Sequence, residues 1–278
     1  MKIKILLPTI LFIPFFAYSR DIPKDEATIK AYYFFSQKEK TSEKPFRSDT
    51  MTLDIGSQVS YYYDETMVLK DSVYNQAFSN LSLDRIKSIS VIKNQEGVFD
   101  NFLGDKYEMN YLDGTTEKMY KNRSTGDVTI IDNLSNHDYR CDDPVGTLNW
   151  EISSDTATVL NYLCQKAKLH FRGRDYEAWF APEIPINDGP WKFMGLPGLI
   201  LKVNDINRLI AFDCIGLQHL KTPFPIEIPN KKYLKCNRKE FEKLIKDRGD
   251  SMTFGINGGN VTIATKPLSN AFQFLELE

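Results

Sequence analysis

Polar side chains that could take part in acid or base chemistry lie close together between residues 170 and 177. His170, Asp175 and Glu177, with Arg172 beside them, would form a hydrolase site if a nucleophile, a base and an orienting group converged within hydrogen-bond distance. The chain, however, has no G-x-S-x-G, H-E-x-x-H, Gly-rich phosphate loop or EF-hand sequence. We therefore assign no catalytic residue and keep a hydrolase with an unrecognised site as an alternative.

Metal and cofactor sites have little support in the sequence. The three histidines, His137, His170 and His219, are scattered, and no cysteine belongs to a C-x-x-C pair of the kind that binds zinc. Asp142 and Asp143 are adjacent carboxylates, but calcium needs about six or more oxygen ligands, so a solvated turn is the simpler interpretation. His137-Asp138 is interpreted in the same way, as a surface loop. We predict no metal and no cofactor.

Large apolar side chains gather in the connection at residues 182–198. Trp191, Phe193 and Leu196 must either plug the end of a sheet or form an exposed binding surface, and plugging is the more common outcome. Pro197 followed by Gly198 predicts a type II turn, since proline pre-sets φ and glycine tolerates a positive φ. If the connection borders a cleft, the expected ligand-binding residues are Arg172, Arg174, Trp179, Trp191, Phe193 and Leu196.

The four cysteines are Cys141, Cys164, Cys214 and Cys236. An even number in an exported chain suggests two disulfides, for which three connectivities exist. We favour Cys164 with Cys214, because both fall inside strands that we expect to be neighbours.

Residues 1–19 have the three parts of a cleavable signal peptide: two lysines, an apolar run from Ile5 to Phe16, and small residues at Ala17 and Ser19. The apolar run contains two prolines and is shorter than the roughly 20 residues that span a bilayer, which disfavours a membrane anchor. The mature chain is expected to begin at Arg20 and to have no membrane span. No cysteine lies near the cleavage point, so we expect no lipid tether. The predicted location is therefore outside the cytoplasm.

The composition indicates a globular domain and gives no sign of a nucleic-acid partner. The formal net charge is −2 and neither sign forms a long run, so the chain lacks the basic surface that binds phosphate backbones. The 18 Phe, 14 Tyr and 3 Trp residues favour strands.

Alternating apolar and polar residues, the period of half-buried strands, recur along the chain. The sequence Arg172-Gly173-Arg174-Asp175 is expected to be the turn of a long hairpin, and Thr125-Gly126 and Asp113-Gly114 are further turn signals. Strands are predicted at residues 50–56, 61–63, 148–152, 159–171, 176–181, 199–203, 209–217 and 261–263, with an antiparallel meander across residues 89–133.

Two helices are predicted beside these strands. Apolar residues at helical spacing favour one between residues 71 and 88. The second begins after Asn237, a good N-cap with Glu240 three residues later, buries Phe241, Leu244 and Ile245, and ends at Gly249. The three prolines at positions 223, 225 and 229 predict an extended connection before it. The expected fold is therefore α+β and mainly antiparallel: a curved sheet or partial barrel with a few helices, in a single domain at residues 20–278.

The sequence from Phe171 to Val203 resembles the GLPGLI family of exported Bacteroidetes proteins, which is named after the motif present here at Gly195 to Ile200. Residues 160–203 are the densest part of the resemblance, which includes the Phe171-Arg172-Gly173-Arg174 and Gly189-Pro190-Trp191-Lys192-Phe193 sequences. Met194 departs from the small residue that the pattern favours. The resemblance implies an exported domain whose location is the periplasm, with the extracellular space as the alternative. The family has no established activity, so no residue role is transferred.

Three functions fit these observations. The first is a non-enzymatic periplasmic binding or carrier protein, suggested by aromatic richness and the missing catalytic motifs. The second is a cell-envelope interaction or assembly protein, and the third is the hydrolase. The expected partner is an apolar or peptide-like ligand or an envelope protein.

Overall fold

The computed structural model describes residues 22–38, 40, 43–45, 47–69, 72, 115–134, 137–247, 251–256, 259–264 and 275–276. The predicted signal peptide, nearly all of the expected helix at 71–88, the Asp113-Gly114 turn and the helix end at Gly249 lie outside these residues. None of the helices in the described part of the chain is long and apolar enough to cross a membrane.

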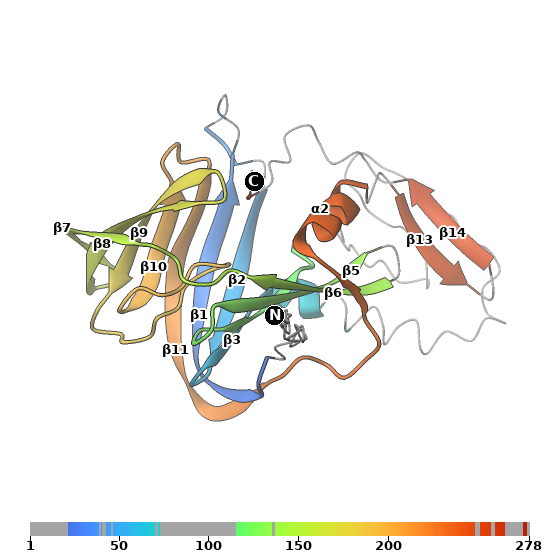
Figure 1. The fold of residues 1–278 in the computed structure, drawn as a ribbon, viewed down its shortest axis with the longest axis horizontal. Coiled ribbons are helices and arrows are strands. Elements are labelled where there is room, and N and C mark those ends of the chain that lie inside the picture. The colour runs from blue at the N-terminus through green and yellow to red at the C-terminus, as the bar shows by residue number, and fades with distance from the viewer. Residues whose placement is uncertain are drawn as a thin grey trace, which may run out of the picture.

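Twelve strands form one open, strongly curved sheet (Figure 1), in the order β12-β6-β5-β4-β3-β2-β1-β11-β10-β9-β8-β7. All of its strand pairs are antiparallel except β12 with β6, which confirms the predicted fold class. The strands are β1 (Asp25–Gln37), β2 (Arg47–Ile55), β3 (Val59–Asp64), β4 (Lys118–Asn122), β5 (Asp127–Leu134), β6 (His137–Pro144), β7 (Glu151–Val159), β8 (Tyr162–Phe171), β9 (Arg174–Ala181), β10 (Leu199–Asp205), β11 (Ile210–Ile226) and β12 (Leu234–Cys236).

Outside this sheet, β13 (Ser251–Ile256) and β14 (Gly259–Ala264) form a separate antiparallel pair, and β14 contains the strand predicted at residues 261–263. A helical segment at residues 65–69 follows β3. Its first turn is capped by the Asp64 carboxylate, which accepts a hydrogen bond from the Met67 amide at 3.1 Å.

Strand β1 is the long central strand, and it is absent from the elements predicted from the sequence. Its consecutive aromatic residues from Tyr32 to Phe35 conceal the strand period, although only alternate ones, Tyr33 and Phe35, are buried. It pairs with β2 on one side and with β11 on the other. The inner face of the sheet, defined here as the face that carries Tyr33 and Phe35, holds the main hydrophobic core.

The predicted long hairpin is present as β8 and β9, with a shorter turn than expected. Phe171 pairs directly with Arg174, so only Arg172 and Gly173 form the turn. Both have positive φ, 46° and 77°, as in a type I′ turn. Because this turn is tight, the Arg172 side chain is held at a fixed point at the end of the hairpin.

Two further expectations about connections are corrected. The proline segment is extended and non-helical as predicted, but residues 223–226 are not a separate connection, because they continue β11 and pair with the start of β1. Gly198 does not have a positive φ, so the type II turn is wrong. Glycine is needed there because an added Cβ would lie 2.3 Å from the Ala181 carbonyl oxygen. The glycine with a left-handed backbone in this motif is Gly195, at φ 92°.

Helix α2 (Arg238–Asp247) begins where the capping sequence predicts. The Asn237 amide donates to the Glu240 carboxylate at 2.9 Å, and the Glu240 amide donates to the Asn237 side chain at 3.0 Å. This reciprocal capping box fixes the first turn of the helix. Phe241 is buried, and Leu244 and Ile245 pack against the core, which confirms the predicted apolar stripe.

Candidate functional site

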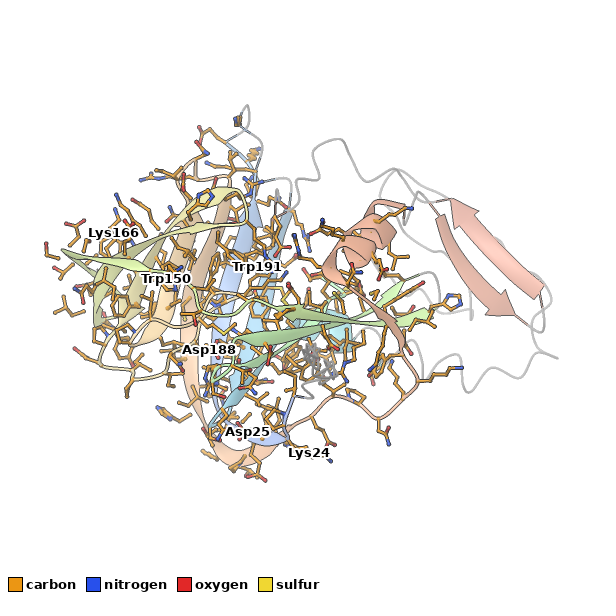
Figure 2. The ribbon with its side chains drawn as sticks, viewed as in Figure 1. Lys24, Asp25, Trp150, Lys166, Asp188 and Trp191 are labelled. Carbon is orange, nitrogen blue, oxygen red and sulfur yellow. The ribbon has the colours of Figure 1, made fainter. Side chains whose placement is uncertain are left out.

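The connection at residues 182–198 covers the inner face of the sheet, and its large apolar side chains are buried. Trp191, Phe193 and Leu196 are 4%, 0% and 1% exposed. The Phe193 ring lies 4.8 Å from the Tyr176 ring and 5.2 Å from the Trp191 ring. These side chains plug the curved sheet, as the more common of the two sequence interpretations expects; Trp191 is labelled in Figure 2.

A buried ion pair anchors this connection to β4. Lys121 and Asp188 are fully buried, and the Lys121 ammonium donates to the Asp188 carboxylate and to the Gly189 carbonyl. Burial lowers the pKa of Lys121, against the opposing attraction of Asp188. Arg123 adds a second contact to Asp188 at 3.3 Å. Because both partners are buried, the loop is held in one position relative to the sheet.

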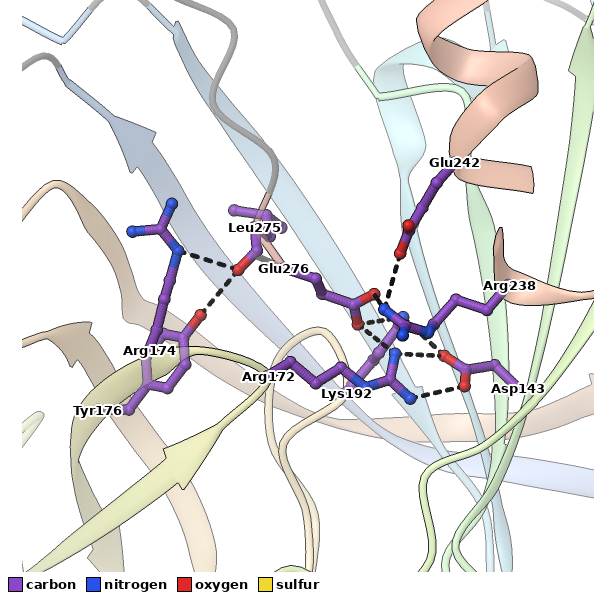
Figure 3. A network of polar contacts seen from close by, with 9 residues as sticks. All are labelled: Asp143, Arg172, Arg174, Tyr176, Lys192, Arg238, Glu242, Leu275 and Glu276. Atoms are coloured by element: carbon purple, nitrogen blue, oxygen red, sulfur yellow. Dashed lines mark hydrogen bonds and ion pairs between the residues drawn. The ribbon is translucent and has the colours of Figure 1, made fainter. Parts of the chain in front are cut away.

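Beside the plug, three cationic side chains converge on the single carboxylate of Glu276 (Figure 3). Arg172 and Lys192 each lie 2.5 Å from its Oε1 atom, and Arg238 lies 3.3 Å from its Oε2 atom. These three cations come from the β8–β9 turn, the connection at 182–198 and the first residue of α2. Segments far apart in the chain therefore meet at one carboxylate.

Asp143, on β6, holds two of these cations in place. Its carboxylate accepts two hydrogen bonds from Arg172, at 2.7 and 2.9 Å, and one from Lys192 at 2.7 Å. Burial alone would raise the pKa of Asp143, but the hydrogen bonds from Arg172 and the attraction of Lys192 outweigh it and hold the pKa below its ordinary value. Burial also disfavours the charged form of Arg172, yet its carboxylate partners raise its pKa.

The main chain of the same segment is bound a short distance away. The Leu275 carbonyl oxygen accepts hydrogen bonds from Arg174 Nε and from the Tyr176 hydroxyl, each at 3.1 Å. Arg174 and Tyr176 lie two residues apart on β9 and so share its inner face. The site therefore binds one residue by its backbone and the next by its side chain.

The backbone of Trp191 explains how one short stretch serves both the plug and the charged cluster. Its φ of 51° lies in the left-handed region, which is uncommon for a bulky residue and costs about 1–3 kcal/mol. The Trp191 ring packs on Phe193 while the next side chain, Lys192, reaches Asp143. The Lys192 ammonium lies 5.2 Å from the Trp191 ring centre, so the cation and the aromatic ring also contact each other.

A cavity of about 100 Å³ adjoins the charged cluster. Its apolar wall includes Phe35, Trp191, Phe212 and Phe241, and its polar wall includes Lys192 and Arg238, with Leu275 and Glu276 also in contact. The cavity is therefore a small space beside the bound segment.

The ligand-binding residues expected from the sequence are only partly brought together. Arg172 and Arg174 contact the segment at Leu275–Glu276, and Trp191 lines the cavity, whereas Phe193 and Leu196 lie in the core. Trp179 is half-buried and alternates with Arg174 and Tyr176 along β9, which places it on the other face. Its ring lies 5.8 Å from the Lys166 ammonium.

The side chains considered for a hydrolase diverge. His170 and Asp175 contact each other at 2.7 Å on the exposed outer face, at 65% and 64% side-chain exposure. Glu177 pairs with Lys166, and Arg172 points to Asp143 instead. His170 and Asp175 therefore pair with each other, while Glu177 and Arg172 take other partners, so the four side chains do not converge as a nucleophile, a base and an orienting group.

Asp143 shows where sequence reasoning failed. We interpreted Asp142-Asp143 as a solvated turn and His137-Asp138 as a surface loop, but all four residues lie in β6 and Asp143 is 3% exposed. Lys192, Arg238 and Glu276 were also missed. The signal available in the sequence was weak: Lys192 lies between the aromatic residues Trp191 and Phe193, and a lysine buried beside them needs a partner of opposite charge.

The cysteines are free thiols in this structure. The reason for pairing Cys164 with Cys214 is wrong, because β9 and β10 lie between β8 and β11. Within the described residues, no group of three or more His, Cys, Asp or Glu side chains is arranged to hold a metal ion.

Comparisons with known proteins agree with the fold and leave the activity open. Two solved structures of PNGF-II, in two crystal forms, match with TM-scores of 0.53 and 0.52 and 14% identity, over 83% of this chain. The match covers 35% and 34% of those chains, so this chain spans about a third of their length. A likeness at this identity concerns the fold alone. The comparison with curated proteins found no match.

A family model matches residues 171–202, the stretch that contains the β8–β9 turn, the plug and Lys192. The family is described as Porph_ging, a protein of unknown function. The match supports a relationship to an uncharacterised family, and the GLPGLI name stays a prediction. Residues 171–202 thus match the Porph_ging model, within a fold similar to part of PNGF-II.

Proposed function

We propose that this is an exported, non-enzymatic protein that binds an acidic segment of a peptide or an envelope protein at the site formed by Arg172, Arg174, Lys192 and Arg238. The observation that carries the proposal is the capture of Leu275–Glu276 in that site, by two donors to the backbone carbonyl and three cations around the carboxylate. The segment of the chain itself occupies the place of the ligand.

The charges of the site favour an acidic ligand. Arg172, Lys192 and Arg238 face Asp143, Glu242 and Glu276, so these six charges balance while Glu276 is bound, and Arg174 beside Leu275 adds a further positive charge. Without Glu276 the other five of these six charges would leave one net positive charge in a half-buried position. Charge-assisted hydrogen bonds to a carboxylate are about twice as strong as neutral ones. A carboxylate from another chain would restore the balance.

The size of the cavity favours a peptide segment over an enclosed apolar ligand. Pockets for small molecules have volumes of roughly 300–1,000 Å³, whereas the cavity here has about 100 Å³. A peptide needs no enclosed space of that size, since its backbone binds Arg174 and Tyr176 and its carboxylate binds the three cations. The apolar wall can receive part of one neighbouring side chain, as it receives Leu275.

Binding in cis and in trans should compete. A segment attached to the chain has a high effective concentration at the site, so it lowers the apparent affinity for an external peptide. The variant Glu276→Gln removes the charge of the internal segment and leaves Arg172, Lys192 and Arg238 intact. We expect this variant to bind an external acidic peptide about tenfold more tightly than the unchanged chain.

The experiment is a fluorescence-anisotropy titration of a labelled peptide with the sequence of residues 271–278 against both full-length chains. Glu43→Gln is the matched control, because Glu43 is a fully exposed acid that pairs with Lys38 and not with the cations of the site. The control should behave as the unchanged chain. Binding that is absent from the unchanged chain, Glu276→Gln and the control alike would overturn the proposal.

A further inference from the structure

Two of the four cysteines are brought into register by the parallel pair of strands that precedes α2. Cys236 on β12 is the direct partner of Cys141 on β6. Neighbouring strands lie about 4.8 Å apart, inside the roughly 4.4–6.8 Å that separates the Cα atoms of disulfide-bonded cysteines. The Cys236 thiol also points toward β6, where its Sγ atom lies 3.9 Å from the Arg140 carbonyl oxygen.

The other two cysteines are not strand partners. Cys164 lies on β8 and Cys214 on β11, with two strands between them. The thiol of Cys164 is directed to the Tyr162 carbonyl at 3.6 Å, and that of Cys214 to the Gly216 carbonyl at 3.5 Å. Each thiol is thus engaged with its own strand.

We propose that Cys141 and Cys236 form a disulfide that fastens β12 and the start of α2 to β6, while Cys164 and Cys214 remain thiols. The spacing links this bond to the charged cluster: Cys141 lies two residues before Asp143 on the same face of β6, and Cys236 lies two residues before Arg238. The crosslink holds Arg238 beside the groups that surround Glu276. The proposed disulfide is independent of peptide binding, and its test involves no peptide.

The bond requires an oxidant, which is a disulfide-donor protein of the compartment to which the chain is exported. The Cys236 thiolate attacks the donor disulfide and releases one donor thiolate. The Cys141 thiolate then displaces the second donor sulfur, which leaves the Cys141–Cys236 bond and a reduced donor dithiol. Two protons and two electrons pass from the cysteines to the donor.

The order of these steps follows from accessibility. Cys236 is half-buried and Cys141 is fully buried, so Cys236 is the residue that a donor reaches. Burial raises the pKa of both thiols and keeps them protonated once the protein is folded. A donor therefore reacts with the small deprotonated fraction of Cys236, and the burial of Cys141 shields the finished bond from reduction.

The test uses the full chain exported to an oxidising compartment and purified without reductant. Free thiols are alkylated, the protein is digested without reduction, and linked peptides are identified by mass spectrometry. We expect one crosslink, Cys141 to Cys236, with alkyl groups on Cys164 and Cys214. Alkylation of all four cysteines, or any other pairing, overturns the proposal.

Thermal unfolding gives a second measurement. Because the bond closes a long loop, reduction should lower the Tm by roughly 5–10 °C. Cys236→Ser should match the reduced chain and no longer respond to reductant, while Cys164→Ser should respond as the unchanged chain does. A Tm that reductant leaves unaltered in the unchanged chain contradicts the proposal. If Cys236→Ser fails to fold, the peptide map of the unchanged chain still shows whether the Cys141–Cys236 disulfide is present.

Discussion

Two regions within residues 171–202 sit side by side and differ in the way they are stabilised. The plug, formed by the side chains of Trp191, Phe193 and Leu196, is apolar and closed by aromatic contacts. The charged cluster, which includes Arg172 and Lys192, is held by ion pairs to Asp143 and Glu276. The plug fixes the shape of the inner face, and the charged cluster determines which segment binds there. Adjacent residues in one motif can therefore have separate roles.

The plug should give the largest effect on stability. Phe193→Ala removes a fully buried ring that contacts several other rings. We expect the free energy of unfolding to fall by about 3–5 kcal/mol, the usual cost of such a cavity. Urea unfolding measures it, with Phe34→Ala, at 40% exposure, as the control. Equal costs for the two variants would remove the distinction between plug and surface.

The charged cluster should differ from the plug in its response to pH. The pKa of Asp143 is lowered in the folded state, so the stabilisation that Asp143 provides is complete above its unfolded pKa of about 3.9 and is lost as the pH falls through the lower folded value. We expect Asp143→Asn to cost about 2 kcal/mol at neutral pH. This cost should shrink below about pH 4, whereas the cost of Phe193→Ala should stay constant.

Urea unfolding of both variants and the unchanged chain, at neutral pH and at several values below pH 4, separates the two behaviours. If the cost of Asp143→Asn were the same at every pH, the ion pairs with Arg172 and Lys192 would not be the source of its stabilisation.

The smallest effect on stability, with a clear effect on binding, is expected at Arg238. Its side chain is 23% exposed, and it contacts Glu276 from the first turn of α2. Arg238→Gln should weaken the binding of an acidic peptide about tenfold, equivalent to about 1.4 kcal/mol, and change the free energy of unfolding by less than about 0.5 kcal/mol. Lys168→Gln, on the exposed face of β8, is the charge-matched control. A loss of affinity in both variants would indicate a general effect of charge.

The sequence was informative where local chemistry decides the structure. The capping residues of α2 and the glycine turn of the β8–β9 hairpin predicted those elements, because each depends on neighbouring residues. It failed at β1, where consecutive aromatic residues hide the strand period, and at Asp143, whose burial depends on Arg172 and Lys192 from distant parts of the chain. An ion pair between residues far apart in the chain leaves no periodic pattern in the sequence from which it could be predicted.

The most direct test of the peptide-binding account is the ratio of two dissociation constants. Isothermal titration of the full-length Glu276→Gln chain compares the peptide of residues 271–278 with the same peptide carrying glutamine at the position of Glu276. We predict that the glutamine peptide binds about tenfold more weakly, since it lacks the charge that the three cations surround. Equal affinity for the two peptides, or no binding of either, would contradict the account.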